Sequence, residues 1–178
     1  MQTGLGRTGE WFGHHHAGIR ADIVTVAKAL GNGVPIGAVW ASAEVAAAFK
    51  PGDHGSTFAG QPLAAAAARE VLRILTEIDA PSLAAQRGAE LVIALQGLEG
   101  VESVRGLGLL IGVELTAACL QDRTAADVAR LCLDAGLIVN GVTSTALRLA
   151  PPLTITPAEI MEGVAILASV LDRGGEVT

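Results

Sequence analysis

Lys28 is the residue whose type and position point most directly to chemistry. It follows an apolar, β-branched run from Ile23 to Ala27, and a turn containing Gly31 and Gly33 comes directly after it. The ammonium group of a lysine is strongly hydrated, and burying it without a partner is costly. Two interpretations of this stretch are open: a lysine that reaches water from a strand end, or a desolvated amine that forms a Schiff base with a carbonyl compound.

Other residue types with chemical potential give weaker signals. Three adjacent histidines, His14, His15 and His16, would point in different directions on a helix, so we expect a solvated or capping role and no metal site. Cys119 and Cys132 form no CxxC pair, which predicts two reduced thiols.

Short strands and helices are expected to position Lys28. The run Ile23 to Ala27 predicts a short buried strand, and residues 34–41 the next. Ser42 is a good N-cap for a helix over 43–49, and Pro62 suits the first turn of a helix over 63–78. Further helices are predicted over residues 82–98, 124–135 and 158–171, and further strands over 101–106, 109–115, 137–142 and 146–149.

These elements fall into two zones. Residues 1–78 are strand-turn-strand elements that lead into a long helix, and residues 79–178 form a compact α+β domain. The join is expected at the helix end near Asp79, because no low-complexity linker separates the zones.

Composition excludes several classes of function. The 178 residues carry a net charge of −6 and only 3% aromatic residues, with no tyrosine, so neither nucleic-acid nor anionic-membrane binding is expected. No apolar run is long enough to span a membrane, and no signal-peptide core is visible at the start. We therefore expect a cytoplasmic protein.

Five segments together resemble the class III pyridoxal-phosphate aminotransferases. They match the family in order and in spacing, and they are residues 2–9, 25–31, 33–38, 54–62 and 147–153. The resemblance covers the whole chain. It implies an α/β fold, namely the C-terminal part of a fold-type I transferase, in which residues 1–78 are the remnant of the large cofactor-binding domain and residues 79–178 the small α+β domain.

The resemblance also implies residue roles. Lys28 would hold pyridoxal 5'-phosphate as a Schiff base and then move a proton at the substrate α-carbon. Gln2 would sit near the ring hydroxyl of the cofactor, and Thr57 would bind its phosphate across the interface of a homodimer. Ser56 would line the substrate site. Arg148 would bind a carboxylate of 2-oxoglutarate or glutamate through two parallel hydrogen bonds.

The residues alone leave simpler interpretations open. Gln2 and Thr57 fit ordinary loop positions, and Arg148 fits an exposed position on a strand, since it alternates with Leu147 and Leu149. Arg7 is expected to be structural.

The chain departs from the family pattern at its start. The aspartate that pairs with the pyridine nitrogen, the phosphate cradle and a second substrate arginine precede the position of Gln2 in the family, and this sequence does not contain them. We therefore expect a truncated chain with exposed strand edges and an open apolar face around Ile23 to Val26.

Two kinds of function remain. The first, implied by the resemblance, is transfer of an amino group from N-acetylornithine to 2-oxoglutarate, a step of arginine biosynthesis, with ornithine, succinylornithine and 4-aminobutyrate as alternative class III substrates. The second is a non-catalytic fragment.

Overall fold

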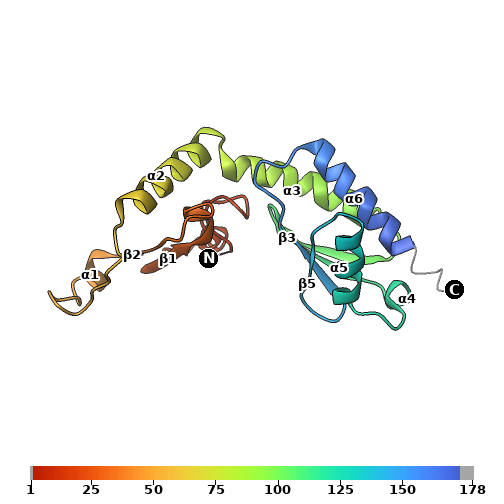
Figure 1. Ribbon diagram of the computed structural model, residues 1–178, viewed down its shortest axis with the longest axis horizontal. Coiled ribbons are helices and arrows are strands. Elements are labelled where there is room, and N and C mark those ends of the chain that lie inside the picture. The colour runs from red at the N-terminus through yellow and green to blue at the C-terminus, as the bar shows by residue number, and fades with distance from the viewer. Residues whose placement is uncertain (1, 173–178) are drawn as a thin grey trace.

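The computed structural model describes residues 2–172. Two sheets and three long helices dominate the part of the chain that is described, and Figure 1 shows two of these helices, α2 and α3, running in succession across both parts of the molecule. The helices are η1 (Gly13–Ala17), η2 (Lys28–Leu30), α1 (Ala43–Ala46), α2 (Pro62–Glu77), α3 (Ala80–Gln96), α4 (Ala117–Leu120), α5 (Ala125–Asp134) and α6 (Pro157–Asp172). The strands are β1 (Ile23–Ala27), β2 (Gly37–Ala41), β3 (Val101–Leu107), β4 (Leu110–Leu115), β5 (Asn140–Gly141) and β6 (Ala146–Leu149).

The N-terminal part contains a two-stranded antiparallel sheet, in which Ile23 of β1 pairs with Ala41 of β2. The predicted strand is present, but the prediction that it is buried is wrong. Ile23 is 55% exposed, and in β2 Val39 is 70% and Trp40 51% exposed. The reason is that no third strand among residues 2–172 joins this sheet. The open apolar face expected from the sequence is therefore present.

Helices α2 and α3 meet at Asp79, whose backbone is left-handed with φ 46°. Pro62 occupies the first turn of α2, as predicted, because its missing N–H has no partner at a helix start. The predicted domain join lies at this bend. The division into residues 1–78 and 79–178 stays a prediction.

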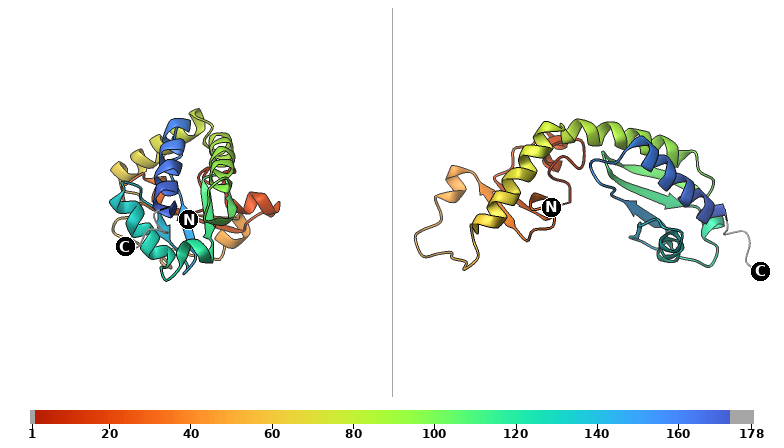
Figure 2. Two further views of the ribbon diagram at one scale, coloured as in Figure 1. Left: turned by 90° about the vertical axis from the view of Figure 1, so that its right-hand side faces the viewer. Right: turned by 45° about the horizontal axis from the view of Figure 1, so that its top comes forward.

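The C-terminal part is an antiparallel sheet in the order β3-β4-β6-β5, with helices on one face (Figure 2). Strand β4 alternates strictly, so that Ile111, Val113 and Leu115 are buried while the residues between them are not. The buried residues share one core with side chains of α3, α5 and α6. The opposite face of the sheet is therefore available for polar and charged side chains.

Three elements are shorter in the structure than the sequence predicts. Strand β2 begins only at Gly37, after Pro35, which lacks the N–H that a sheet ladder needs. The strand predicted over 137–142 is reduced to Asn140–Gly141, since only these two residues pair with β6. The helix predicted over 43–49 is the single turn α1.

The glycine-rich loop at the start of the chain is fixed to the C-terminal sheet. The backbone N–H of Leu109 donates to the carbonyl of Arg7 at 2.9 Å, and the Arg7 guanidinium donates to the carbonyls of Leu109 and Pro151. Arg7 is thus structural, as the sequence analysis expected. These bonds anchor the loop, at whose start Gln2 lies, to the sheet.

Candidate functional site

Lys28 lies at the end of β1, where it begins the short helix η2. Its backbone is left-handed, with φ 55°, a conformation that is uncommon for a residue with a side chain and that clusters at functional sites. The side chain is exposed rather than desolvated, so within this chain the lysine reaches water. No ion pair joins Lys28 to a carboxylate of residues 2–172, which leaves its amine accessible to a carbonyl compound.

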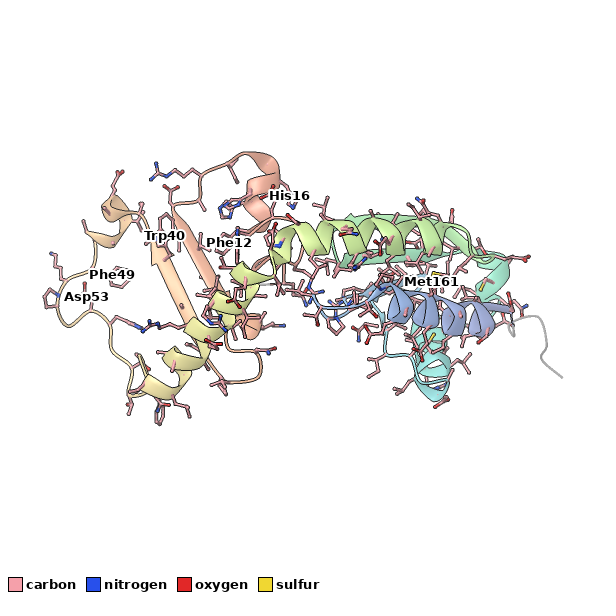
Figure 3. The ribbon with its side chains drawn as sticks, turned by 90° about the horizontal axis from the view of Figure 1, so that it is seen from above. Phe12, His16, Trp40, Phe49, Asp53 and Met161 are labelled. Carbon is pink, nitrogen blue, oxygen red and sulfur yellow. The ribbon has the colours of Figure 1, made fainter. Side chains whose placement is uncertain are left out.

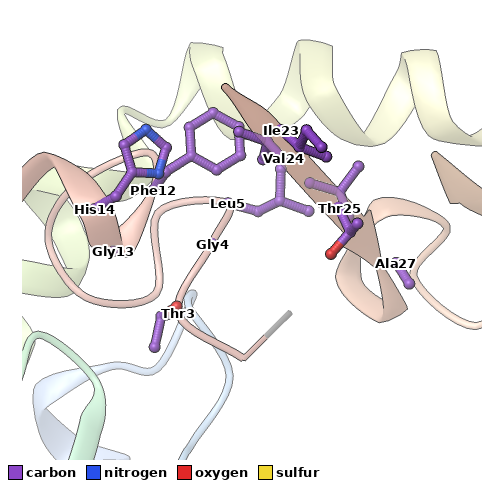
Figure 4. A pocket seen from close by; sticks show the side chains of 11 residues that line it. Thr3, Gly4, Leu5, Phe12, Gly13, His14, Ile23, Val24, Thr25 and Ala27 are labelled. Atoms are coloured by element: carbon purple, nitrogen blue, oxygen red, sulfur yellow. The ribbon is translucent and has the colours of Figure 1, made fainter. Parts of the chain in front are cut away.

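A pocket of about 240 Å³ lies between the N-terminal loop and β1 and ends at Ala27, the residue before Lys28. Figure 4 shows Thr3 and Gly4, which follow Gln2, on one side of it and Thr25 and Ala27, which precede Lys28, on the other. The fold therefore brings the chain segments of two predicted cofactor-binding residues to the same hollow. Lys28 itself lines a separate, open hollow with Asn32 and Pro35 of the turn that follows it.

Arg148 lies on β6 and projects from the exposed face of the C-terminal sheet. Its neighbour Leu147 is fully buried, which confirms that the two side chains point in opposite directions. One terminal nitrogen of the guanidinium donates to Oε1 of Gln2 at 3.5 Å, and the other donates to Oδ1 of Asn140 at 3.1 Å. The contact with Gln2 joins residues 146 positions apart in the sequence.

Two arginines, Arg105 and Arg148, lie on the same face of the sheet, and they differ in whether a carboxylate pairs with them. Arg105 and Arg148 both pair in register with Gly112 of β4, from opposite sides. Arg105 donates to Glu114 at 2.9 Å, and the hydroxyl of Thr145 also donates to Glu114. The pKa of Glu114 is lowered, chiefly by the Thr145 hydroxyl and then by Arg105.

Arg148 has no such acidic partner in the described part of the chain. Among residues 2–172 no carboxylate lies within ion-pair distance of its guanidinium, and its two acceptors are neutral amides. An arginine that is held in place without being neutralised is suited to bind an external carboxylate.

Ser56 and Thr57 lie elsewhere. Both are exposed, on the loop that connects α1 to α2. Figure 3 shows Phe49 and Asp53, which precede them, at the end of the molecule opposite Met161 of α6. Within one chain the structure does not bring this loop to Arg148, so the roles of Ser56 and Thr57 stay predictions that require a second chain.

The histidines singled out in the sequence make local contacts near the N-terminal loop. His16 makes a 3.1 Å hydrogen bond with Thr8, and His15 lies 3.8 Å from Glu10. In the described part of the chain there is no cluster of three metal-ligating side chains. No helix formed by these residues has the length and hydropathy to cross a membrane.

With this geometry in place, comparison with known proteins identifies the family. The model of the family "Aminotransferase class-III" matches residues 1–171. The chain belongs to the class III aminotransferases. It is 44% identical over 171 residues to an acetylornithine aminotransferase of Corynebacterium efficiens and 46% identical over 175 residues to one of Mycobacterium tuberculosis. These alignments cover 96% and 97% of this chain but 41% and 42% of the relatives, so the chain spans less than half their length.

Solved structures agree. Ornithine delta-aminotransferase of Plasmodium falciparum superimposes with a TM-score of 0.85 at 36% identity, over 99% of this chain and 46% of that one. Acetylornithine aminotransferase of Elizabethkingia anophelis gives 0.83 at 31% identity, over 97% and 44%. The predicted fold class, the C-terminal part of a fold-type I transferase, is confirmed.

Sequence reasoning missed Asn140, which contacts Arg148. Its local signal is weak, since it is a single polar residue at the end of the apolar run from Leu137 to Val139. Only the strand register shows that it pairs with Arg148.

Proposed function

We propose that this chain supplies the Schiff-base lysine and the carboxylate-binding arginine of an aminotransferase that moves an amino group from N-acetylornithine to 2-oxoglutarate in arginine biosynthesis. The contact between Arg148 and Gln2 at 3.5 Å carries the proposal, because it joins the predicted carboxylate site to the predicted cofactor site. The relatives named acetylornithine aminotransferase support the choice of amino donor.

The residues present fit pyridoxal phosphate. Lys28 has a primary amine that pairs with no carboxylate of residues 2–172, and it directly follows Ala27, which lines the same pocket as Thr3 and Gly4, the neighbours of Gln2. When bound, the cofactor supplies an electron sink for the α-carbon of the substrate. Lys28 would hold the cofactor covalently, and the side-chain amide of Gln2 would donate to its ring hydroxyl.

The same residues then account for the handling of substrate. Arg148 would fix a substrate carboxylate through parallel hydrogen bonds and so orient the α-carbon. The substrate amine would displace the amine of Lys28 from the cofactor. The freed amine of Lys28 would then take the proton from the substrate α-carbon and deliver it to C4′ of the cofactor.

A homodimer completes this proposal. The loop carrying Ser56 and Thr57 projects from its own chain and is exposed throughout, which suits a segment that reaches a neighbouring subunit (Figure 3). There Thr57 would donate to the cofactor phosphate and Ser56 would line the substrate site. We place the assembly in the cytoplasm.

Reductive trapping tests the central claim, because the sequence contains only two lysines, Lys28 and Lys50. After incubation with pyridoxal phosphate and reduction with borohydride, peptide mass spectrometry is expected to find the cofactor on Lys28. The Lys28→Ala variant should lose this label, and the matched control Lys50→Ala should keep it.

Substrate response completes the test. In the unmodified protein the cofactor absorbance should change on addition of N-acetylornithine, and more than on addition of ornithine. Label on both lysines alike, or no absorbance change with any amino donor, would contradict the proposal and favour a non-catalytic fragment.

A further inference from the structure

We infer that Asn140 is a positioning residue for Arg148: its side-chain amide fixes the guanidinium in the orientation that receives a substrate carboxylate, while leaving the positive charge uncompensated. The inference rests on the proposed function, because it assigns a role in the binding of 2-oxoglutarate or glutamate.

Strand pairing places Asn140 beside Arg148. The two residues are direct partners in the antiparallel pair of β5 and β6, so their side chains leave the sheet on the same face. Oδ1 of Asn140 accepts from a terminal nitrogen of Arg148 at 3.1 Å. Since β5 lies at the edge of the sheet, Asn140 bounds the arginine on its outer side.

On its other side, toward β4, Arg148 has no neighbouring side chain at its directly paired position. Its partner there is Gly112 of β4, which has no side chain to support the guanidinium. The side chain of Arg105 lies across that glycine, with Cγ 3.6 Å from the position a Cβ would take, but its guanidinium turns to Glu114. Lateral support of Arg148 within the sheet therefore comes from Asn140.

Counting donors shows why this arrangement favours a carboxylate. A guanidinium has five N–H donors. Asn140 and Gln2 each accept one, which leaves three for a ligand that needs two. Both acceptors are neutral, so the charge of Arg148 is not cancelled before substrate arrives.

The neighbouring arginine provides the contrast. Arg105 is bound by a carboxylate, that of Glu114, and an incoming anion would have to displace it. An aspartate in place of Asn140 would likewise form an ion pair with Arg148, which a substrate carboxylate would have to displace. The neutral amide at position 140 therefore leaves the Arg148 guanidinium free to bind a substrate carboxylate.

The experiment uses the full chain with its cofactor and measures binding of 2-oxoglutarate by calorimetry. Asn140→Ala should weaken binding about 10-fold, near the lower end of the effect of one hydrogen bond to a charged group. Asn140→Asp should weaken it about 100-fold, since substrate must compete with a fixed carboxylate. Gln96→Glu, which adds the same charge at an exposed site on α3, is the matched control and should bind like the unmodified protein.

A second readout needs no ligand. Rotation of the Arg148 guanidinium, followed by ¹⁵N NMR and assigned with Arg148→Lys, should be hindered in the unmodified protein and faster in Asn140→Ala. If Asn140 were purely structural, its substitution would alter the melting temperature but not the rotation of the Arg148 guanidinium. The alanine variant would then also not bind 2-oxoglutarate more tightly than the aspartate variant.

The outcomes separate the two proposals. If the unmodified protein binds 2-oxoglutarate, Arg148→Lys weakens it, and Asn140→Ala changes neither affinity nor rotation, the role of Asn140 is overturned and the proposed function stands. If the unmodified protein does not bind 2-oxoglutarate, or Arg148→Lys binds it equally well, the proposed function fails and the role of Asn140 fails with it.

Discussion

Gly88 lies in the interior of α3 and faces the turn between β3 and β4. A Cβ at this position would lie 2.1 Å from the carbonyl oxygen of Gly108 and 2.4 Å from its carbonyl carbon. Gly108 cannot retreat easily, because it is left-handed with φ 52° and is itself packed against the backbone of Arg7 and Thr8. Substitution Gly88→Ala should therefore push α3 away from the turn that holds the N-terminal loop.

The expected cost follows from three contributions. Alanine favours a helix interior over glycine by about 1 kcal/mol. Overpacking against a backbone that cannot move costs about 1–3 kcal/mol. Loss of the two hydrogen bonds between Arg7 and Leu109 costs about 1 kcal/mol each. The balance is a destabilisation of about 2–4 kcal/mol.

Gly163 provides the matched control in α6. There a Cβ would meet only Leu137 Cδ1 at 3.5 Å, an ordinary contact. Gly163→Ala should raise the free energy of unfolding by about 0.5–1 kcal/mol. Urea unfolding of both variants measures the difference. If Gly88→Ala is as stable as the unmodified protein, the tight contact between α3 and the turn is refuted.

Two further predictions concern titratable groups. Because its pKa is lowered in the fold, Glu114 stabilises the protein above its unfolded pKa, and this contribution is lost as the pH falls through the folded value. Thr145→Ala should raise the pKa of Glu114, measured by carboxyl NMR titration, and flatten the acid dependence of stability; an unchanged pKa would contradict the assigned cause. Burial raises the pKa of Cys132 to about 11, whereas Cys119 is only partly buried. A thiol reagent near pH 8 should therefore modify Cys119 first, and Cys119→Ser should remove the fast phase; a persisting fast phase would show that Cys132 is accessible.

Much of the fold was predictable because its signals are local. The Ser42 hydroxyl accepts from the backbone N–H of Val45, and Thr124 forms a capping box with Asp127 at the start of α5. Caps, proline positions and apolar periodicity act over one turn of helix or a few residues of strand. They therefore determined where most elements begin and end.

The site was predictable only in part. The sequence identified Lys28 and Arg148 as candidates, since motif spacing is written along the chain. It did not reveal that Lys28 is left-handed and exposed, because exposure depends on which segments pack around it.

Long-range pairing decided the rest. The bond from Arg148 to Gln2, its register with Asn140, and the exposure of Ile23 all depend on contacts between distant segments. A strand sequence states which residues share a face, but its partner strand, and hence the neighbours of each side chain, is chosen by the tertiary fold. For this protein the sequence alone determined the family, most of the elements and the reactive residue types, and the tertiary structure alone decided which of those residues meet.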